Sequence, residues 1–130
     1  MIKIFNSLEE IKKYYDKETN TYVFKENGEY IDLVVFNFDL DINANIDAMD
    51  IKAKNINVLD IDSTDINALD INALDIKAND INAWDIIAND ITYFAVCFAY
   101  NNIKCKSIKG RAPTTNHFVL NGKLEVENNE

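Results

Sequence analysis

The chain has 130 residues and a net charge of −9, which corresponds to one acidic domain with a modest core. No apolar run reaches the roughly 18 residues needed to span a bilayer, and the N-terminal MIKIFNSLEEIKKYY lacks the apolar region of a signal peptide. With Cys97 and Cys105 as the only cysteines, a disulfide framework is not expected. Composition therefore excludes a membrane or secreted class and predicts a cytoplasmic protein with reduced thiols.

Residues 1–38 are predicted to form a small cap made of one helix and one hairpin. Ser7-Leu8-Glu9-Glu10 has the form of a capping box, and an apolar face follows it, so we expect a helix from about 7 to 16. The stretches TYVFKE and EYIDLVVF flank Asn27-Gly28, which is a strong hairpin signal. Rods built from repeats need their ends covered, so this segment is expected to cover the first coil of the repeat that follows.

A five-residue repeat occupies the middle of the chain, from about residue 39 to 112. Isoleucine recurs without a miss at positions 46, 51, 56, 61, 66, 71, 76, 81, 86 and 91. A mostly small residue comes two positions after each isoleucine, and an aspartate comes four positions after it, with Asn55 as the only substitute between 50 and 90. The unit is therefore I-x-A-x-D.

A period of five fits neither regular helix nor unbroken strand. Five residues of α-helix advance about 500°, so the isoleucines would form no buried stripe. In an unbroken strand, an odd step would place alternate isoleucines on opposite faces. All ten stay inside only if each unit is a short strand followed by a turn, for which Asp is well suited because its carboxylate accepts nearby backbone N–H groups. The sequence therefore predicts an all-β coil.

This pattern resembles the pentapeptide-repeat family. The resemblance implies a right-handed, four-sided parallel β-helix with four units, or twenty residues, per coil. Ile51, Ile71 and Ile91 would then stack, as would Asp50, Asp70 and Asp90, in a rod on the order of 20 Å long with coils ~4.8 Å apart. One departure is visible, since the family places the small residue two positions before the large one, whereas here it comes two positions after.

Beyond Ile91 the inward pairs continue, but the stretch Tyr93 to Tyr100 is far bulkier than the repeat. We interpret it as a plug for the core, with a dimer interface through Phe94, Phe98 and Tyr100 as the alternative. Residues 113–130 are predicted to form a loop, a hairpin around Asn121-Gly122 and a tail. This end also resembles small hypothetical phage and bacterial proteins that carry DINA-type repeats.

The aspartates are the main candidates for function. Residues 39–92 carry twelve aspartates and three lysines, so the whole excess of negative charge lies in the repeat. The structural interpretation is turn capping, and the functional one is an acidic face that imitates the phosphates of DNA. The predicted acidic face comprises Asp50, Asp60, Asp65, Asp70, Asp75, Asp80, Asp85 and Asp90.

Other candidates are weaker. Leu69, Leu74 and Trp84 are predicted to point outward, either as an apolar partner patch or as a surface covered by the N-terminal segment. His117 is the only histidine and has no nucleophile or metal ligand near it in sequence. Calcium-binding β-rolls need a glycine-rich unit, and no glycine occurs between 28 and 110. No cofactor or metal is therefore expected.

The function predicted from these features is a non-catalytic, acidic protein-interaction module. As a DNA mimic it would occupy the nucleic-acid site of a basic partner, such as a gyrase-like protein or a target of phage anti-defence, without binding nucleic acid or membranes itself. The alternative is a structural scaffold or oligomerisation module with no such target. A homodimer is expected in either case.

Overall fold

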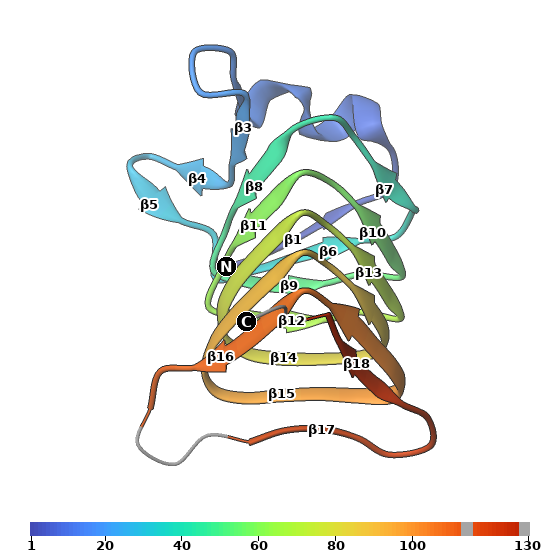
Figure 1. The fold of residues 1–130 in the computed structure, drawn as a ribbon. Helices are drawn as coiled ribbons and strands as arrows, with labels where there is room; N and C mark the ends of the chain where they lie inside the picture. Colours follow the sequence, from blue (N-terminus) through green and yellow to red (C-terminus); the bar gives the residue numbers. More distant parts are fainter. Residues whose placement is uncertain (113–115, 128–130) are drawn as a thin grey trace.

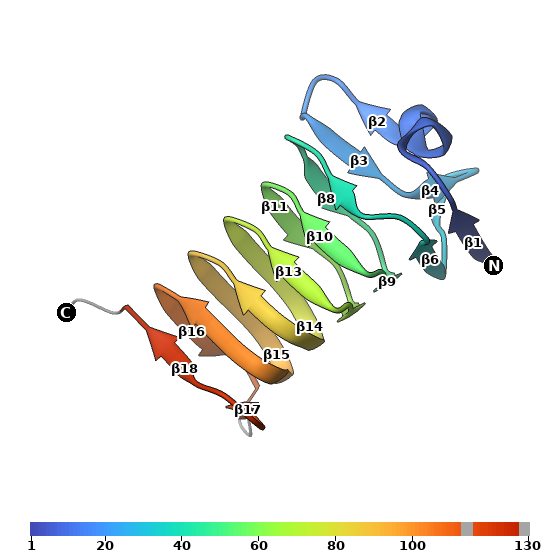
Figure 2. The ribbon, with the colours of Figure 1, turned by 90° about the vertical axis from the view of Figure 1, so that its right-hand side faces the viewer.

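The structure, a computed structural model, describes residues 1–112 and 116–127. Most of the described chain is β-strand, wound into a parallel solenoid whose coils stack from the N-terminal to the C-terminal end (Figures 1 and 2). The all-β, parallel β-helix fold predicted from the repeat is confirmed.

The solenoid has three flat sides, which we call A, B and C in the order in which each coil from residue 45 onward passes through them (Figure 1). The strands β14 (Asp75–Ile87) and β15 (Asp90–Cys105) bend around the corners and contribute to all three sides. Side A also contains β3 (Thr21–Val23), β8 (Asn45–Asp47), β11 (Asp60–Asp62) and β16 (Ser107–Gly110). Side B also contains β1 (Ile2–Phe5), β6 (Leu33–Phe36), β9 (Asp50–Lys52), β12 (Asp65–Asn67) and β17 (Asn116–Val119). Side C also contains β7 (Leu40–Asp41), β10 (Asn55–Asn57), β13 (Asp70–Asn72) and β18 (Leu124–Val126).

Strand register shows that a coil takes three units, not four. Ile46 pairs with Ile61, and Ile61 pairs with Ile76, a step of fifteen residues. The same step holds on the other two sides. The four-sided coil of twenty residues implied by the family resemblance is therefore wrong.

The coil is right-handed, as predicted. Figure 1 views the rod from its C-terminal end, and the chain passes anticlockwise from β8 on the left through β9 at the bottom to β10 on the right. Figure 2 shows the coils advancing toward the C-terminus, which is toward the viewer of Figure 1. A path that turns anticlockwise as it approaches the viewer is right-handed.

The core is the interior of this triangle. All ten isoleucines of the repeat are at most 2% exposed, and most of the small residues that follow them are also buried. Backbone hydrogen bonds between coils continue through the corners, as in the pairs Leu69 N to Lys54 O and Trp84 N to Leu69 O. The repeat therefore buries its apolar side chains and satisfies its backbone at the same time.

The N-terminal segment covers its end of the rod, but not quite as predicted. The helix expected from about 7 to 16 is present as a 3₁₀ helix, Leu8–Tyr14, but the Ser7 side chain makes no cap hydrogen bond. The hairpin at Asn27-Gly28 is present, with positive φ at both residues, but it joins only β4 (Lys25–Glu26) to β5 (Glu29–Tyr30). The flanking strands β3 and β6 pair in parallel with the repeat, and β2 (Tyr15–Asp16) adds an antiparallel edge to β3.

Aromatic packing closes this end of the core. Phe5, Tyr14, Phe24 and Phe36 are buried, and their ring centroids lie 5.1 to 6.2 Å apart in neighbouring pairs. Such tilted and edge-on ring pairs add to the stabilisation from burial. The N-terminal segment therefore acts as the cap that the sequence predicted.

The C-terminal hairpin predicted within residues 113–130 is wrong for the described part of that segment. β17 and β18 do not pair with each other, and both pair in parallel with β15. They form sides B and C of one more coil, and Asn121-Gly122 lies in the corner between them. The loop expected at 113–115 and the residues 128–130 lie outside the described residues.

The bulky stretch in β15 is accommodated by extra residues at the corners. Asp80 pairs with Val96 and Asp85 with Asn102, so this coil is longer than fifteen residues. Only Tyr93 of its large aromatic residues is fully buried, and its hydroxyl lies 2.6 Å from Nδ1 of His117 in the next coil. The predicted plug is therefore Tyr93 alone. Cys105 is a buried free thiol, and burial raises its pKa to about 11.

Candidate functional site

The aspartates of the repeat form three rows that run along the rod, which we call the carboxylate ladders. Each aspartate directly precedes an inward isoleucine in its strand, so its side chain points outward. The ladder on side A is Asp60, Asp75 and Asp90; on side B it is Asp50, Asp65 and Asp80; on side C it is Asp70 and Asp85. Stacked members are separated by the ~4.8 Å between coils.

The eight predicted aspartates therefore do not share a face. The expected stacking of Asp50 on Asp70 and Asp90 is wrong, because it assumed four units per coil. Asp50 stacks instead on Asp65, and Asp75 stacks on Asp90. Negative charge surrounds the rod rather than covering one side of it.

Ladder side chains also connect one coil to the next. Oδ1 of Asp80 accepts the backbone N–H of Val96 at 3.2 Å, and Oδ1 of Asp85 accepts that of Asn102 at the same distance. Oδ1 of Asp90 accepts the hydroxyl of Ser107 at 2.6 Å. The aspartates were expected to cap the turns of their own coil. These three instead accept hydrogen bonds from the residue stacked on them in the next coil.

Asparagine makes the same connection where it occupies a ladder position. Oδ1 of Asn45 accepts the N–H of Asp60 at 3.2 Å, and Oδ1 of Asn102 accepts the N–H of Lys123 at 2.9 Å. A neutral amide oxygen therefore suffices for the hydrogen bond. The negative charge of the aspartates is not required by it.

Repulsion within the ladders is visible in the pKa values. Burial raises the pKa of Asp65, and the carboxylates of Asp50 and Asp80 raise it further. The pKa of Asp75 is raised in the same way, by burial and then by its two ladder neighbours. Among the described residues, the ion pairs all involve residues 1–38, so no lysine forms an ion pair with a ladder aspartate.

Side A carries a second row of aspartates that the sequence analysis did not single out. Asp47 and Asp62 pair across β8 and β11 and point outward beside the first ladder. The hydroxyl of Tyr30 donates to both carboxylate oxygens of Asp47, at 2.9 Å. The signal was present in the sequence as D-I-D at 60–62, since two aspartates flanking an inward isoleucine must both face outward.

The predicted apolar patch of Leu69, Leu74 and Trp84 is divided between two corners of the triangle. Leu69 and Trp84 are consecutive along the corner between sides B and C. Leu74 follows Leu59 along the corner between sides C and A. Tyr100 was predicted at a dimer interface. It lies next to Trp84 along the corner between sides B and C, and the two ring centroids are 4.6 Å apart.

The other two residues of the predicted dimer interface lie elsewhere around the same coil. Phe98 is on side B, where its ring centroid is 4.8 Å from that of Phe118. Phe94 is near the corner between sides A and B, beneath the guanidinium of Arg111, whose carbon lies 5.8 Å from the ring centroid. The three side chains are therefore spread from one corner of side B to the other.

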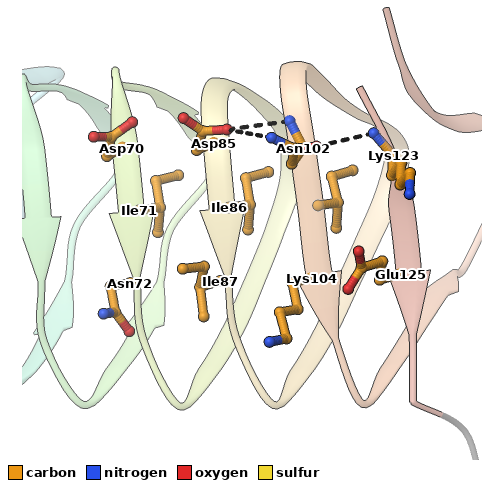
Figure 3. A pocket seen from close by; sticks show the side chains of 11 residues that line it. Asp70, Ile71, Asn72, Asp85, Ile86, Ile87, Asn102, Lys104, Lys123 and Glu125 are labelled. Carbon is orange, nitrogen blue, oxygen red and sulfur yellow. Dashed lines mark hydrogen bonds between the residues drawn. The ribbon is translucent and has the colours of Figure 1, made fainter. Parts of the chain in front are cut away.

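Side C is hollowed by a shallow groove of about 640 Å³ (Figure 3). Its floor is the strand backbone at the isoleucines, and two rows of outward side chains form its walls. One wall is Asp70, Asp85, Asn102 and Lys123, and the other is Asn72, Ile87, Lys104 and Glu125. The groove is acidic toward the N-terminus and of mixed charge toward the C-terminus.

Comparison with known proteins gives no relative to guide the interpretation. No protein-family model, no curated protein and no solved structure matches this chain. In residues 1–112 and 116–127, no helix is long and apolar enough to cross a membrane. No three or more His, Cys, Asp or Glu side chains of that part of the chain come together as a metal site.

Proposed function

We propose that this protein is an acidic interaction module whose rod occupies the nucleic-acid-binding surface of a basic protein. The observation that carries the proposal is the density of unneutralised charge along and around the rod. This role needs no reacting group, only a rigid scaffold that presents carboxylates at regular intervals.

The charge per unit length approaches that of duplex DNA. Residues 39–92 make about 3.6 coils of fifteen, or about 17 Å of rod at ~4.8 Å per coil. Their net charge of −9 then corresponds to about one negative charge per 2 Å. Duplex DNA carries about one per 1.7 Å of its axis. The three ladders hold eight of the twelve aspartates and distribute them around the rod, as the two phosphate strands distribute charge around DNA.

The ladders also keep charge that folding does not need. Asn45 and Asn102 make the inter-coil hydrogen bond without it, and stacked carboxylates repel by ~0.9 kcal/mol per pair in water. The chain keeps aspartate at eight ladder positions despite this repulsion, which supports a role for the negative charge itself in the function. Electrostatic complementarity of this kind accelerates and orients binding to a basic surface.

A structural scaffold is the second candidate, and a specific observation favours it. Asp80, Asp85 and Asp90 each bond to the coil above them. In this alternative the charge only keeps the protein soluble.

The two candidates differ in how binding responds to charge. We would immobilise the protein, capture partners from an extract of its native cell, and purify the captured protein. A variant with Asp60→Asn, Asp65→Asn, Asp80→Asn and Asp85→Asn lacks four charges but keeps a side-chain oxygen that can accept the inter-coil hydrogen bond. We expect it to bind the partner at least tenfold more weakly, and a duplex DNA to displace the parent protein. Binding should also weaken steeply as salt shortens the Debye length below ~8 Å.

The matched control changes four outward, uncharged positions of the same rod, with Ser at 57, 67, 72 and 82. It should bind like the parent. If the charge-reduced variant also binds like the parent, or if DNA does not compete, the mimicry proposal is wrong and the scaffold remains.

A further inference from the structure

An exposed apolar ridge runs along the corner between sides B and C. Leu69 is 46% exposed and Trp84 is 47% exposed, and the Trp84 ring is supported from the C-terminal side by Tyr100. The indole ring of Trp84 therefore presents a flat aromatic face to solvent.

Two carboxylates lie directly beside this ridge. Asp70 and Asp85 follow Leu69 and Trp84 in the chain and stack on each other on side C. Together with Asn101, these four residues line a shallow groove of about 300 Å³. The same two carboxylates form the acidic wall of the larger groove on side C (Figure 3), so they lie between two hollows.

The carboxylate pair is not compensated within the described part of the chain. No ion pair there includes Asp70 or Asp85. Oδ1 of Asp85 accepts from the backbone and side-chain nitrogens of Asn102, which orients this carboxylate beside the ridge. Burial and then the neighbouring Asp85 raise the pKa of Asp70. A cation placed here would relieve that repulsion.

We propose that this groove binds an arginine side chain of a basic partner, with the guanidinium against the Trp84 ring and its N–H groups on Asp70 and Asp85. The inference rests on the proposed function, because it names the group by which a basic partner is recognised at one place on the rod. Arginine fits better than lysine for two reasons. Its planar guanidinium stacks on an aromatic face, and its fork of donors matches carboxylates.

Trp84 is the only tryptophan of the chain, so its fluorescence reports on this groove alone. We would titrate the protein with the peptide Gly-Arg-Gly-Arg-Gly and with its lysine counterpart at low salt. The arginine peptide should change the fluorescence saturably and bind at least about threefold more tightly than the lysine peptide. A double variant, Asp70→Asn with Asp85→Asn, should weaken binding of the arginine peptide about tenfold or more.

The matched control is Asp60→Asn with Asp75→Asn, a stacked pair on side A with the same change in charge and no tryptophan beside it. It should weaken binding less than about threefold. Trp84→Ala, measured by calorimetry, should weaken the arginine peptide more than the lysine peptide. Equal losses for the two double variants, equal affinity for the two peptides, or no saturable fluorescence change would each overturn the inference.

These outcomes are distinct from failure of the proposed function. If DNA still displaces the captured partner while the arginine peptide shows no preference for this groove, the DNA-mimic function is supported and the arginine site is contradicted. If the arginine site is confirmed but the captured partner has no nucleic-acid site, the arginine site is supported and the DNA-mimic function is contradicted.

Discussion

At the scale of the residue, each ladder aspartate has a hydrogen-bonding role and an electrostatic effect, and the two can be separated. The amide oxygen of Asn45 replaces the carboxylate in the hydrogen bond to the next coil. It cannot replace the charge. Substitution by asparagine therefore removes repulsion while it keeps the connection between coils.

We predict that Asp65→Asn stabilises the protein at neutral pH. The pKa of Asp65 is raised by burial and by Asp50 and Asp80. A carboxylate whose pKa is raised on folding contributes stability below its ordinary value of about 3.9, and that stability is lost as the pH rises through the raised value. Stacked charges repel by ~0.9 kcal/mol before salt screening, so we expect the variant to melt a few degrees higher at pH 7.

Thermal melting at pH 7 and at about pH 4 tests this, because the advantage of the variant should shrink in acid. The pKa of Glu26 is lowered, mainly by its hydrogen bond from Tyr14, so its own contribution is lost in acid. That contribution is common to both proteins and cancels in the difference. A lower melting temperature for the variant at pH 7 would show that the charge itself stabilises the ladder.

At the scale of the element, one short strand divides its residues between core and solvent. In β13, Ile71 is 1% exposed, whereas its neighbours Asp70 and Asn72 point outward. The hydrogen bonds to the strands on either side hold this orientation, since β13 pairs with both β10 and β14. Adjacent positions therefore tolerate very different changes.

We expect Ile71→Asp to unfold the rod and Asn72→Asp to leave it folded. The first change loses about 1.5–3 kcal/mol of apolar burial and also places a carboxylate in the core. The second adds one charge on the surface and should cost less than about 1 kcal/mol. Circular dichroism with thermal melting distinguishes the two. Equal stability of both variants would contradict the inward orientation of Ile71.

At the scale of the whole molecule, the two ends of the rod differ. The N-terminal end is closed by buried aromatic rings and the 3₁₀ helix. At the other end, Leu124 and Val126 occupy positions on side C whose counterparts in earlier coils are buried, yet they are 38% and 39% exposed. Within the described residues, the last coil is therefore covered less completely than any coil before it.

Because the last coil leaves more apolar surface exposed, we now place the predicted dimer contact at that end of the rod. We still expect a dimer, but through the last coil rather than through Phe94, Phe98 and Tyr100, which are spread from one corner of side B to the other. Sedimentation at high micromolar concentration should show a dimer for the parent and a monomer for Leu124→Lys. Leu74→Lys, which is also an exposed leucine but lies on a corner of the rod, is the control and should remain dimeric. A monomeric parent would contradict the prediction.

The sequence was sufficient to predict which residues face inward. The period of five, with an isoleucine and a small residue two positions later, admits only short strands that turn in one direction, and Ile46 to Ile91 are buried accordingly. The outward position of the aspartates follows from the same alternation. These properties depend on local geometry, which the five-residue unit carries by itself.

The number of units per coil was decided only by the tertiary structure. A turn of 90° and a turn of 120° place the same residues inside, so the pattern alone does not distinguish a square from a triangle. The corner angle depends on contacts between residues fifteen apart, as for Ile61 on Ile76. The number of units per coil also sets which residues stack on one another. It therefore divides the aspartates among three ladders and places Trp84 beside Asp70 and Asp85. The C-terminal coil was missed for the same reason, because its strands are held by long-range pairing with β15 and not by a turn signal in the sequence.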